Sequence, residues 1–550
     1  MNDCHKKLLI NLVLLFISPF LSVTVNAQLE RIIPHLEKKG NAIRLIVDDK
    51  PFFILGGELG NSSFTSLEYM EPIWPRLKAM NLNTLLAPIY WELIEPAEGQ
   101  FDFELYDKLI KEARKNNFKL VLLWFGSWKN SMSSYAPSWI KKNQERFPRV
   151  KDDKGKSYEI LTPFGKENLE ADMKAFQSLM KHIKEIDEDQ HTIIMMQPEN
   201  EIGMLPTARD YNPLANKKFR ENIPAEFIDY LKKNKGRLVP EFEEVWKKNG
   251  YKDTGTWEEI FGKGQQTDEL FMAWYYAKFT NDVAEAGKSV YPLPMYVNAA
   301  LNRPGSLPGA GYPSGGPLPH LIDVWKAGAP SIDFLSPDFY FPDIKHWCDL
   351  YTRQENPLFI PEHRFDSTAA AKALFVLGHY KAIGFSPFSV ESARNPENEP
   401  IAKIYNMMNQ LIPLIADNQD QDKIEGVLFD KENRETVFQL GDYEFTVRHS
   451  YTLGYEANSK NNNWETAGAL FIQAGENEFY LAGSGIVATF KNLKNPELNV
   501  GILKDEEGKF ENNKWKVIRY LNGDQTHQGR HIRILLDNYS IQRFELYNYE

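Results

Sequence analysis

Two glutamates that could act together on one bond each follow a short apolar segment of the chain. Glu201 comes soon after the apolar residues 192–197, and Glu362 comes soon after the apolar residues 357–360. Taken singly, either glutamate could be an ion-pair partner. Facing each other across one cleft, a neutral carboxylic acid and a carboxylate are the two groups that cleavage of a glycosidic bond requires. Those two roles need different pKa values, which burial or mutual repulsion can supply.

The segments around these glutamates alternate between short apolar runs and longer helical patterns. The runs are nearly continuous, as is typical of parallel strands that helices cover. A helical pattern follows each run, and eight such units over about 370 residues predict an α/β fold of the (β/α)8 TIM barrel type. An open, doubly wound sheet is the alternative, but the glycines at 56–60 lack the spacing of its phosphate-binding loop. The eight expected strands are 51–57, 82–90, 119–125, 192–197, 294–301, 332–340, 357–360 and 384–390.

In such a barrel, functional side chains gather at the carboxyl ends of the strands. Glu201 and Glu362 would follow the fourth and the seventh strand. Because these strands lie on opposite sides of the barrel, both carboxyl groups could point at one place. This arrangement favours a shared catalytic role over two separate ion pairs.

The first 27 residues have the pattern of a cleaved signal peptide. Lys6 and Lys7 precede an apolar run that Pro19 interrupts, and a small-x-small cleavage pattern ends at Ala27. The run is short for a membrane span, which needs about 20 residues, and no later segment is long or apolar enough to cross a membrane. We therefore expect export to the periplasm or the medium, with no integral membrane segment after cleavage.

The remaining chain divides into two regions with different sequence patterns. Residues 28–418 would form the barrel, with a charged, helix-prone insertion around 204–268. Residues 419–550 contain short apolar segments separated by Asn, Gly and Asp, which predicts a C-terminal all-β sandwich. The sandwich could bind glycan or brace the barrel, and bracing is favoured because the sequence reveals no exposed row of aromatic residues.

Composition excludes several classes of function. A net charge of −11 over 550 residues argues against nucleic acid as a partner, because nucleic acid binding needs a basic face. The 11 histidines include no closely spaced metal-binding pair, and serine-hydrolase and dinucleotide-binding motifs are missing. We therefore expect no metal and no other cofactor. A carbohydrate substrate is the expected partner, and assembly into a homo-oligomer stays open.

The segment after the second expected strand carries the most specific pattern in the chain. Residues 91–103 read WELIEPAEGQFDF. Together with Asn200, Glu201 and Glu362, this segment resembles the clan A glycoside hydrolases. The likeness is to β-galactosidases of families 35 and 42, and in particular to the bacterial family 35 type with an appended β-rich domain. It implies a retaining exo-β-glycosidase that removes terminal β-D-galactosyl residues from oligo- or polysaccharides by double displacement.

The resemblance also implies roles for individual residues. Glu201 would be the general acid/base and Glu362 the nucleophile, while Asn200 would hydrogen-bond the sugar 2-hydroxyl. Tyr340 could donate a hydrogen bond to Glu362 and keep it ionised. Glu58 could bind a sugar hydroxyl or pair with Arg364. The further candidates for substrate binding, all at expected strand ends, are Asn61, Tyr90, Trp91, Trp124, Trp128, Phe388 and Glu391.

One departure from the family pattern concerns the sugar. Family 35 members typically carry a glutamate after the third strand that contacts galactose, whereas residues 123–128 here read LWFGSW, without a carboxylate. Other residues must then recognise galactose, or the substrate is a β-glucoside, an α-L-arabinopyranoside or a β-mannoside. A non-catalytic glycan-binding protein is the alternative of a different class, although a pure binder needs no nucleophile.

Overall fold

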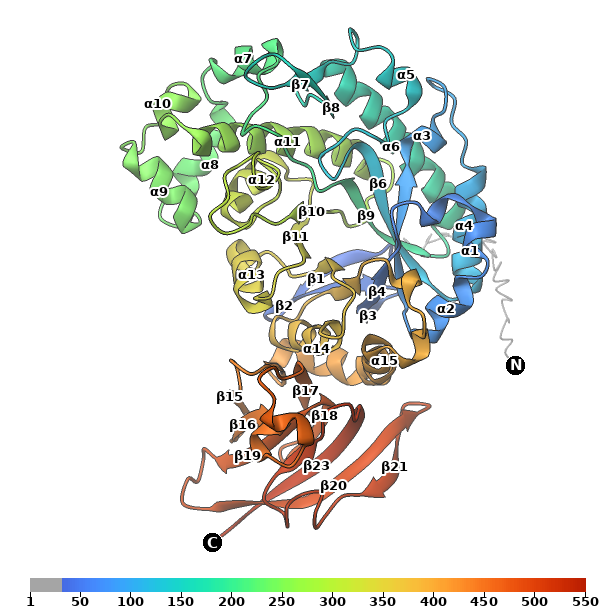
Figure 1. Ribbon diagram of the computed structural model, residues 1–550, viewed down its shortest axis with the longest axis vertical. Coiled ribbons are helices and arrows are strands. Elements are labelled where there is room, and N and C mark those ends of the chain that lie inside the picture. Colours follow the sequence, from blue (N-terminus) through green and yellow to red (C-terminus); the bar gives the residue numbers. More distant parts are fainter. Residues whose placement is uncertain (1–31) are drawn as a thin grey trace, which may run out of the picture. The chain divides into compact units, whose positions relative to one another are not determined.

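The computed structural model describes residues 32–550 (Figure 1). The predicted signal peptide lies outside these residues. Among the described residues, no helix has both the length and the apolar character that crossing a bilayer would need.

Eight parallel strands form a closed barrel, with neighbours in the order β4-β5-β6-β9-β10-β11-β12-β13 and β13 beside β4. Closure between β9 and β10 comes from Met196, whose backbone N–H donates to the Pro294 carbonyl at 3.0 Å. The structure thus confirms the predicted (β/α)8 fold. The strands are β4 (Ile54–Glu58), β5 (Thr84–Tyr90), β6 (Lys119–Lys129), β9 (Ile193–Asn200), β10 (Tyr296–Ala300), β11 (Phe334–Phe339), β12 (Ile360–His363) and β13 (Gly384–Pro387).

Amphipathic helices cover the outside of the barrel. In α4 (Glu104–Lys115), for example, Tyr106, Leu109, Ile110 and Ala113 are buried at helical spacing, while charged residues occupy the other face. The other helices that follow barrel strands are α1 (Leu67–Met70), α2 (Trp74–Ala79), α3 (Trp91–Ile94), α5 (Ser138–Lys141), α6 (Lys166–Asp187), α11 (Gln265–Lys288), α12 (Ile322–Gly328), α13 (Ile344–Tyr351), α14 (Ala369–His379) and α15 (Pro400–Asn418).

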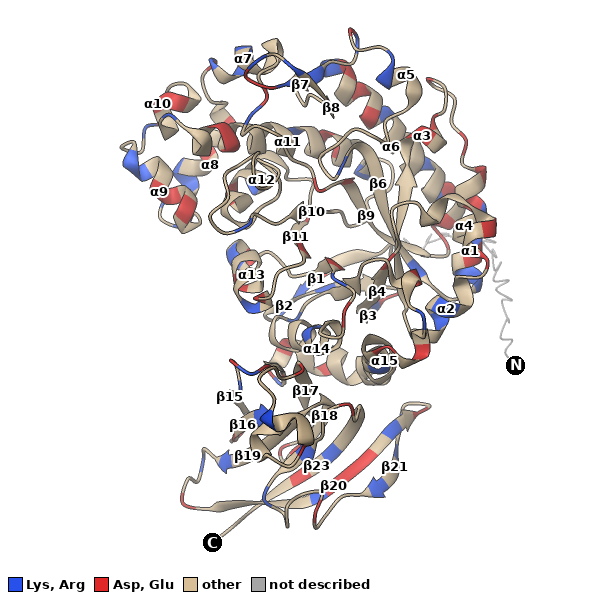
Figure 2. Cartoon of the chain, viewed as in Figure 1, with Lys and Arg blue, Asp and Glu red and all other residues tan. Residues whose placement is uncertain are grey.

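A group of short helices separates β9 from α11, in the region where the sequence indicates a charged insertion. Charged residues of both signs lie on its helices α8 and α9, and acidic residues lie on α10 (Figure 2). The group packs around an aromatic cluster in which Phe227 stacks on Trp274 of α11 with ring centroids 4.7 Å apart. Its helices are α7 (Pro213–Phe219), α8 (Ala225–Asn234), α9 (Pro240–Lys248) and α10 (Trp257–Phe261).

Two small sheets were not predicted. The first expected strand, 51–57, is divided: β3 (Lys50–Phe52) pairs with β2 (Ala42–Val47), which pairs with β1 (His35–Lys39). Only β4 belongs to the barrel. A continuous apolar run cannot reveal this division, because half-buried Phe52 of β3 and buried Ile54 of β4 pack against the same core. The second small sheet is the hairpin of β7 (Arg149–Lys151) and β8 (Ser157–Leu161).

Two antiparallel sheets follow the barrel and form the predicted all-β sandwich. Phe445, Phe471, Phe479 and Phe544 are fully or almost fully buried between them. The larger sheet consists, in spatial order, of β14 (Ile424–Phe429), β17 (Ala467–Gln473), β18 (Glu478–Ser484), β23 (Ser540–Tyr549), β20 (Asn499–Glu511) and β21 (Lys514–Tyr520). The smaller sheet consists of β15 (Glu435–Leu440), β16 (Tyr443–His449), β19 (Ile486–Asn492) and β22 (Ile532–Ile534).

The larger sheet also packs against the barrel helices with its other face. Ile472, Tyr480 and Ile541 belong to the same hydrophobic core as the barrel. The approach is close at Gly378 of α14, where an added Cβ would lie 2.6 Å from the backbone nitrogen of Gly426 in β14. Glycine is therefore required at this contact between the barrel and the sandwich.

Candidate active site

Glu201 and Glu362 lie at the carboxyl ends of β9 and β12 and share one electrostatic environment. Their side chains are buried, with relative exposures of 7% and 6%. Burial, followed by the negative charge of Glu201, raises the pKa of Glu362 to about 7. The structure therefore brings together the two carboxyl groups that the sequence separates by more than 150 positions.

Glu362 is held by its neighbour on β11 and by a tyrosine. Asp338 stands beside it in the parallel register, and the Tyr340 hydroxyl donates a hydrogen bond to Glu362 Oε1. This hydrogen bond lowers the pKa of Glu362 and so opposes the effect of burial. Glu362 Oε2 is buried and has no hydrogen-bond partner within residues 32–550. That oxygen is thus the one available for attack on a bound molecule.

Glu201 is fixed through both its side chain and its backbone. Asn130 donates to its carboxylate, Ser131 Oγ donates to its carbonyl at 2.8 Å, and its own N–H donates to Asn298 Oδ1 at 3.0 Å. Its φ of 45° lies in the left-handed region, as does the φ of 63° at Glu199. Such backbone conformations cost about 1–3 kcal/mol each and persist where the surroundings hold them. The backbone strain at this turn indicates that the surrounding residues fix the direction of the Glu201 side chain.

A buried lysine, which the sequence analysis missed, stands beside Asn200. Lys129 is only 4% exposed, forms no ion pair within the described part of the chain, and donates from Nζ to Asn200 Oδ1 at 2.9 Å. The Asn200 Nδ2 group is buried and unpartnered there, so it is free to donate to a ligand. The Lys129 charge lowers the pKa of Glu362. The sequence predicts a third strand that ends at residue 125, whereas β6 continues to Lys129. Lysines are rarely buried, so no sequence pattern indicated that Lys129 belongs to the site.

Two further carboxyl groups and one amide complete the polar cluster. Glu58 at the end of β4 and Asp338 on β11 are buried; burial, and then the charge of Glu362, raise the pKa of each well above its usual value. Asn298 on β10 donates to Asp338 Oδ2 at 2.6 Å and accepts from the Glu201 N–H. Asn298 therefore links the turn that carries Glu201 to the strand beside Glu362. Neither Asn298 nor Asp338 was a predicted site residue.

Several predicted residues form one wall near this cluster. Tyr90 donates from its hydroxyl to the Asn61 carbonyl, and the Glu391 carboxylate accepts from Gly60 N at 2.8 Å. Burial raises the pKa values of Glu58 and Tyr90, and the charge of Glu391 adds a smaller effect in the same direction. Phe388 forms a β-bridge with Glu58, so these residues are neighbours. The Asn61 side-chain oxygen and Glu391 Oε2 are buried without a hydrogen-bond partner among the described residues.

The alternative role for Glu58, an ion pair with Arg364, is not present. Arg364 is exposed, and its guanidinium donates to the Tyr340 carbonyl at 3.3 Å. The adjacent His363 is buried between Phe339 and Phe385, and burial lowers the pKa of His363 to about 3. A neutral core histidine therefore follows Glu362 in the sequence. Within residues 32–550, no group of three or more His, Cys, Asp and Glu side chains could hold a metal ion.

Three tryptophans that were expected in the site lie elsewhere, which corrects that expectation. Trp124 points to α6, where its Nε1 donates to Asp172 Oδ1 at 2.8 Å. Trp91 donates to Glu95 at 2.8 Å, and Trp128 packs edge-on against Phe279 of α11 with ring centroids 4.6 Å apart. All three are fully buried. A residue near a strand end can face either the pocket or the surrounding helices, and these large rings fill the layer between strands and helices.

Comparison with known proteins finds similarity to β-galactosidases. A model of the glycoside hydrolase family 42 β-galactosidases matches residues 68–282, and a domain of unknown function, DUF5597, matches residues 401–533. The curated β-galactosidase LacZ of Lactobacillus acidophilus is 24% identical over 219 residues, which are 38% of this chain and 28% of that protein. The match therefore spans little more than a quarter of that relative.

Solved β-galactosidase structures are also similar to this chain. One, from Bacillus circulans, has a TM-score of 0.45 and 15% identity, covering 65% of this chain and 56% of its own. Another is a catalytic mutant of Gan42B, a family 42 β-galactosidase from G. stearothermophilus; it has a TM-score of 0.48 and 11% identity, covering 90% of this chain and 98% of its own.

The family match corrects one expectation from the sequence. The closer likeness was expected to family 35, whereas the model that matches the barrel region is that of family 42. Residues 68–282, which hold part of the barrel, are therefore similar to the β-galactosidases of glycoside hydrolase family 42, and an all-β C-terminal part follows the barrel.

Proposed function

We propose that this chain is a retaining β-galactosidase that removes terminal β-D-galactosyl residues from oligo- or polysaccharides. The observation that carries the proposal is the convergence of Glu201 and Glu362, from two distant strands, in one buried cluster of polar side chains, where the charge of Glu201 acts on Glu362. The family 42 match over residues 68–282 supports the choice of galactose.

In the proposed reaction, each carboxyl group has a separate task. Glu362 Oε2 attacks the anomeric carbon while Glu201 transfers its proton to the oxygen of the leaving group, so the glycosidic bond breaks as the glycosyl ester forms. Glu201, now ionised, takes a proton from water, and the resulting hydroxide displaces Glu362 from the anomeric carbon. The two inversions retain the configuration at that carbon.

The charges in the pocket support this exchange of roles. The reaction needs Glu362 as an anion when it attacks and Glu201 as the group that protonates the leaving oxygen. Once the ester has formed, Glu201 accepts the proton from the attacking water. Tyr340 and Lys129 stabilise the Glu362 anion, and the free Nδ2 of Asn200 can donate to the sugar 2-hydroxyl.

The reaction can be tested with a panel of p-nitrophenyl β-galactoside, β-glucoside, β-mannoside and α-L-arabinopyranoside, with proton NMR of the released sugar. We expect the highest kcat/KM on the β-galactoside and the β-anomer as the first product. The α-anomer as first product would refute the retaining mechanism. Binding of galactosides without turnover of any substrate would favour the non-catalytic glycan-binding alternative.

Replacing Lys129 with methionine is expected to reduce kcat/KM for the aryl β-galactoside by about 10- to 100-fold, because a charge-assisted hydrogen bond to Asn200 is lost. The Lys129 ammonium lowers the pKa of Glu362, so its removal raises that pKa. A smaller fraction of Glu362 is then ionised at a given pH. The acid limb of the pH profile of kcat/KM, which reports the free enzyme, should therefore move to higher pH.

Lys119→Met is the matched control, because Lys119 begins the same strand and its Nζ donates to the His191 carbonyl at 2.7 Å. It should leave the pH profile in place. An acid limb that stays unchanged, or moves to lower pH, in Lys129→Met would contradict the role given to Lys129.

A further inference from the structure

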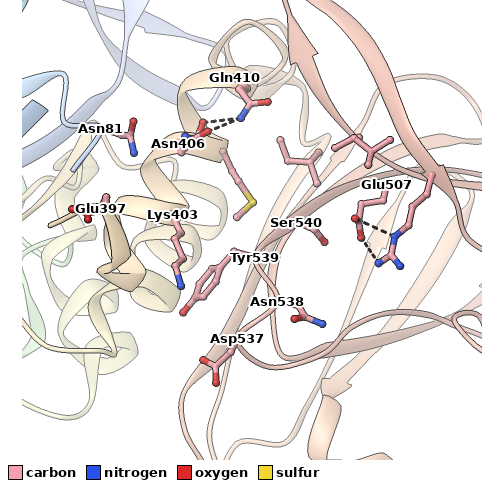
Figure 3. A pocket seen from close by; sticks show the side chains of 15 residues that line it. Asn81, Glu397, Lys403, Asn406, Gln410, Glu507, Asp537, Asn538, Tyr539 and Ser540 are labelled. Atoms are coloured by element: carbon pink, nitrogen blue, oxygen red, sulfur yellow. Dashed lines mark hydrogen bonds and ion pairs between the residues drawn. The ribbon is translucent and has the colours of Figure 1, made fainter. Parts of the chain in front are cut away.

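A polar trough lies where α15 faces the larger sheet of the sandwich (Figure 3). Its main cavity has a volume of about 610 Å³, and an adjoining cavity of about 320 Å³ shares Asn81, Asn406 and Gln410 with it. On the sheet side it is lined by β20, β21 and the turn at 537–540 that leads into β23. The main cavity has the size of an ordinary ligand site, for which about 300–1,000 Å³ is typical.

The trough is separate from the catalytic pocket. Asn81 precedes β5, so it stands near the amino end of that strand, whereas Glu201 and Glu362 stand at the carboxyl ends of theirs. None of the described residues that line the trough belongs to the catalytic cluster. A ligand in the trough would therefore not occupy the place of the bond that is cleaved.

Amide and hydroxyl side chains line much of the trough, beside five charged side chains. The amides of Asn406 and Asn538 each offer donors and an acceptor, and the Ser540 hydroxyl can do both. The side chains of Asn538 and Ser540 make no hydrogen bond to another part of residues 32–550, so truncating them leaves no protein group unpaired. Groups that both donate and accept are suited to ligands rich in hydroxyl groups.

Part of this amide surface is held in place in advance. Gln410 Nε2 donates to Asn406 Oδ1 at 2.8 Å, and the Phe510 backbone N–H donates to Gln410 Oε1 at 3.0 Å. The pairing of Gln410 with Asn406 is visible in Figure 3. This hydrogen bond orients the Asn406 amide, whose Nδ2 group makes no hydrogen bond within residues 32–550. Because these side chains are already fixed, the protein loses less side-chain conformational entropy when a ligand binds.

The trough carries five charged groups of both signs, one pair of which is joined by hydrogen bonds; the five are Glu397, Lys403, Glu507, Arg519 and Asp537. Arg519 donates two hydrogen bonds to the Glu507 carboxylate, at 2.9 and 3.2 Å. Lys403 Nζ lies 5.0 Å from the centroid of the Tyr539 ring, and Figure 3 shows the two side chains directed at each other. Ile518, 61% exposed, adds an apolar surface. Because three acidic and two basic groups are interspersed, the trough does not favour a ligand with a large charge of one sign, and it fits a ligand with hydroxyl groups and apolar C–H faces.

We infer that this trough is a second glycan site, which binds a neutral oligosaccharide chain away from the catalytic centre. The inference rests on the proposed function in one respect: the chain bound there would be a more distant part of the polysaccharide that the enzyme trims. It also assigns a binding role to the part of the chain that matches the domain of unknown function, residues 401–533, and to the turn that follows it.

The test is isothermal titration calorimetry of the full chain carrying Glu362→Gln, so that bound sugars are not consumed. The probes are tetrasaccharides of β-1,4-linked galactose, glucose, mannose and xylose. Adding Asn538→Trp places a bulky ring in the trough, and adding Asn538→Ala with Ser540→Ala removes hydrogen-bonding groups. Adding Asn462→Trp is the control, because Asn462 is exposed and lies outside the trough.

We expect at least one tetrasaccharide to show a binding event that Asn538→Trp abolishes, that the double alanine variant weakens by about tenfold or more, and that Asn462→Trp preserves. In the chain with an intact Glu362, Asn538→Trp should leave hydrolysis of the aryl β-galactoside within about twofold of its original rate, which also shows that the variant folds. If no tetrasaccharide shows a binding event that Asn538→Trp removes, the inference is overturned. Failure of the proposed function would appear separately, as no hydrolysis of any aryl glycoside.

Discussion

Glu362→Gln is expected to reduce kcat/KM for p-nitrophenyl β-galactoside by at least about 10⁴-fold, equivalent to about 5.5 kcal/mol of transition-state stabilisation. The amide that replaces the carboxylate cannot attack the anomeric carbon. It can still accept the hydrogen bond from Tyr340. Because the change removes a buried charge next to Glu201, thermal unfolding should occur at the same temperature or higher, so the loss is one of chemistry and not of folding.

A cavity variant gives a sharper test of the same residue. Glu362→Gly opens space for azide, which can attack the anomeric carbon in place of the carboxylate. We expect azide to restore turnover of an activated aryl β-galactoside and to yield the α-galactosyl azide, since only one inversion then occurs. Glu58→Gln, at a buried carboxyl group of the same cluster, is the matched control and should show no azide rescue. Near-normal activity of Glu362→Gln would refute the assignment of the nucleophile.

Glu201→Ala is expected to have an effect that depends on the leaving group. For phenyl β-galactoside, whose leaving oxygen needs a proton, kcat/KM should fall by about 10²–10⁴-fold. For 2,4-dinitrophenyl β-galactoside, whose leaving group departs as an anion, kcat/KM should fall by less than about tenfold. Hydrolysis of the glycosyl ester also loses its base, so a burst of dinitrophenol should precede a slow steady state.

Azide also tests whether the slow steady state of Glu201→Ala results from the loss of the base. It needs no deprotonation, so it should speed the slow steady state of Glu201→Ala and yield the β-galactosyl azide. Glu199→Gln is the neighbouring control: Glu199 is buried, accepts from the Trp128 N–H at 2.6 Å, and has a pKa that burial and Asp172 raise well above its usual value. Its replacement should leave the dependence on the leaving group unchanged. Equal slowing of both substrates in Glu201→Ala would exclude an acid role.

The sequence was informative about the glutamates for a definable reason. A carboxylate directly after an apolar run must be paired or must face a cleft, and this can be recognised from a single sequence. Lys129, Asn298 and Asp338 gave no such signal, because each continues a strand and its partners lie far away along the chain. Their burial is tolerable only through those partners, which no local pattern reveals.

For the tryptophans, the sequence predicted site residues that the structure places outside the polar cluster. Trp124 and Trp128 belong to the strand that also carries Lys129, yet Lys129 contacts Asn200 whereas the two rings pack against α6 and α11. Neighbouring residues of a strand point to opposite faces, and irregular pairing between β6 and β9 shifts that alternation. A sequence shows the aromatic residue but not the face on which it lies.

The amino-acid order alone determined the class of fold, since buried parallel strands must be apolar along their whole length and therefore leave eight recognisable runs. It also indicated that Glu201 and Glu362 follow apolar strands. Only the tertiary structure decided which polar groups surround them, which rings brace the barrel instead of lining the pocket, and where a second polar trough opens beside the sandwich. These features depend on contacts between residues far apart in the chain, and such contacts exist only once the barrel has closed.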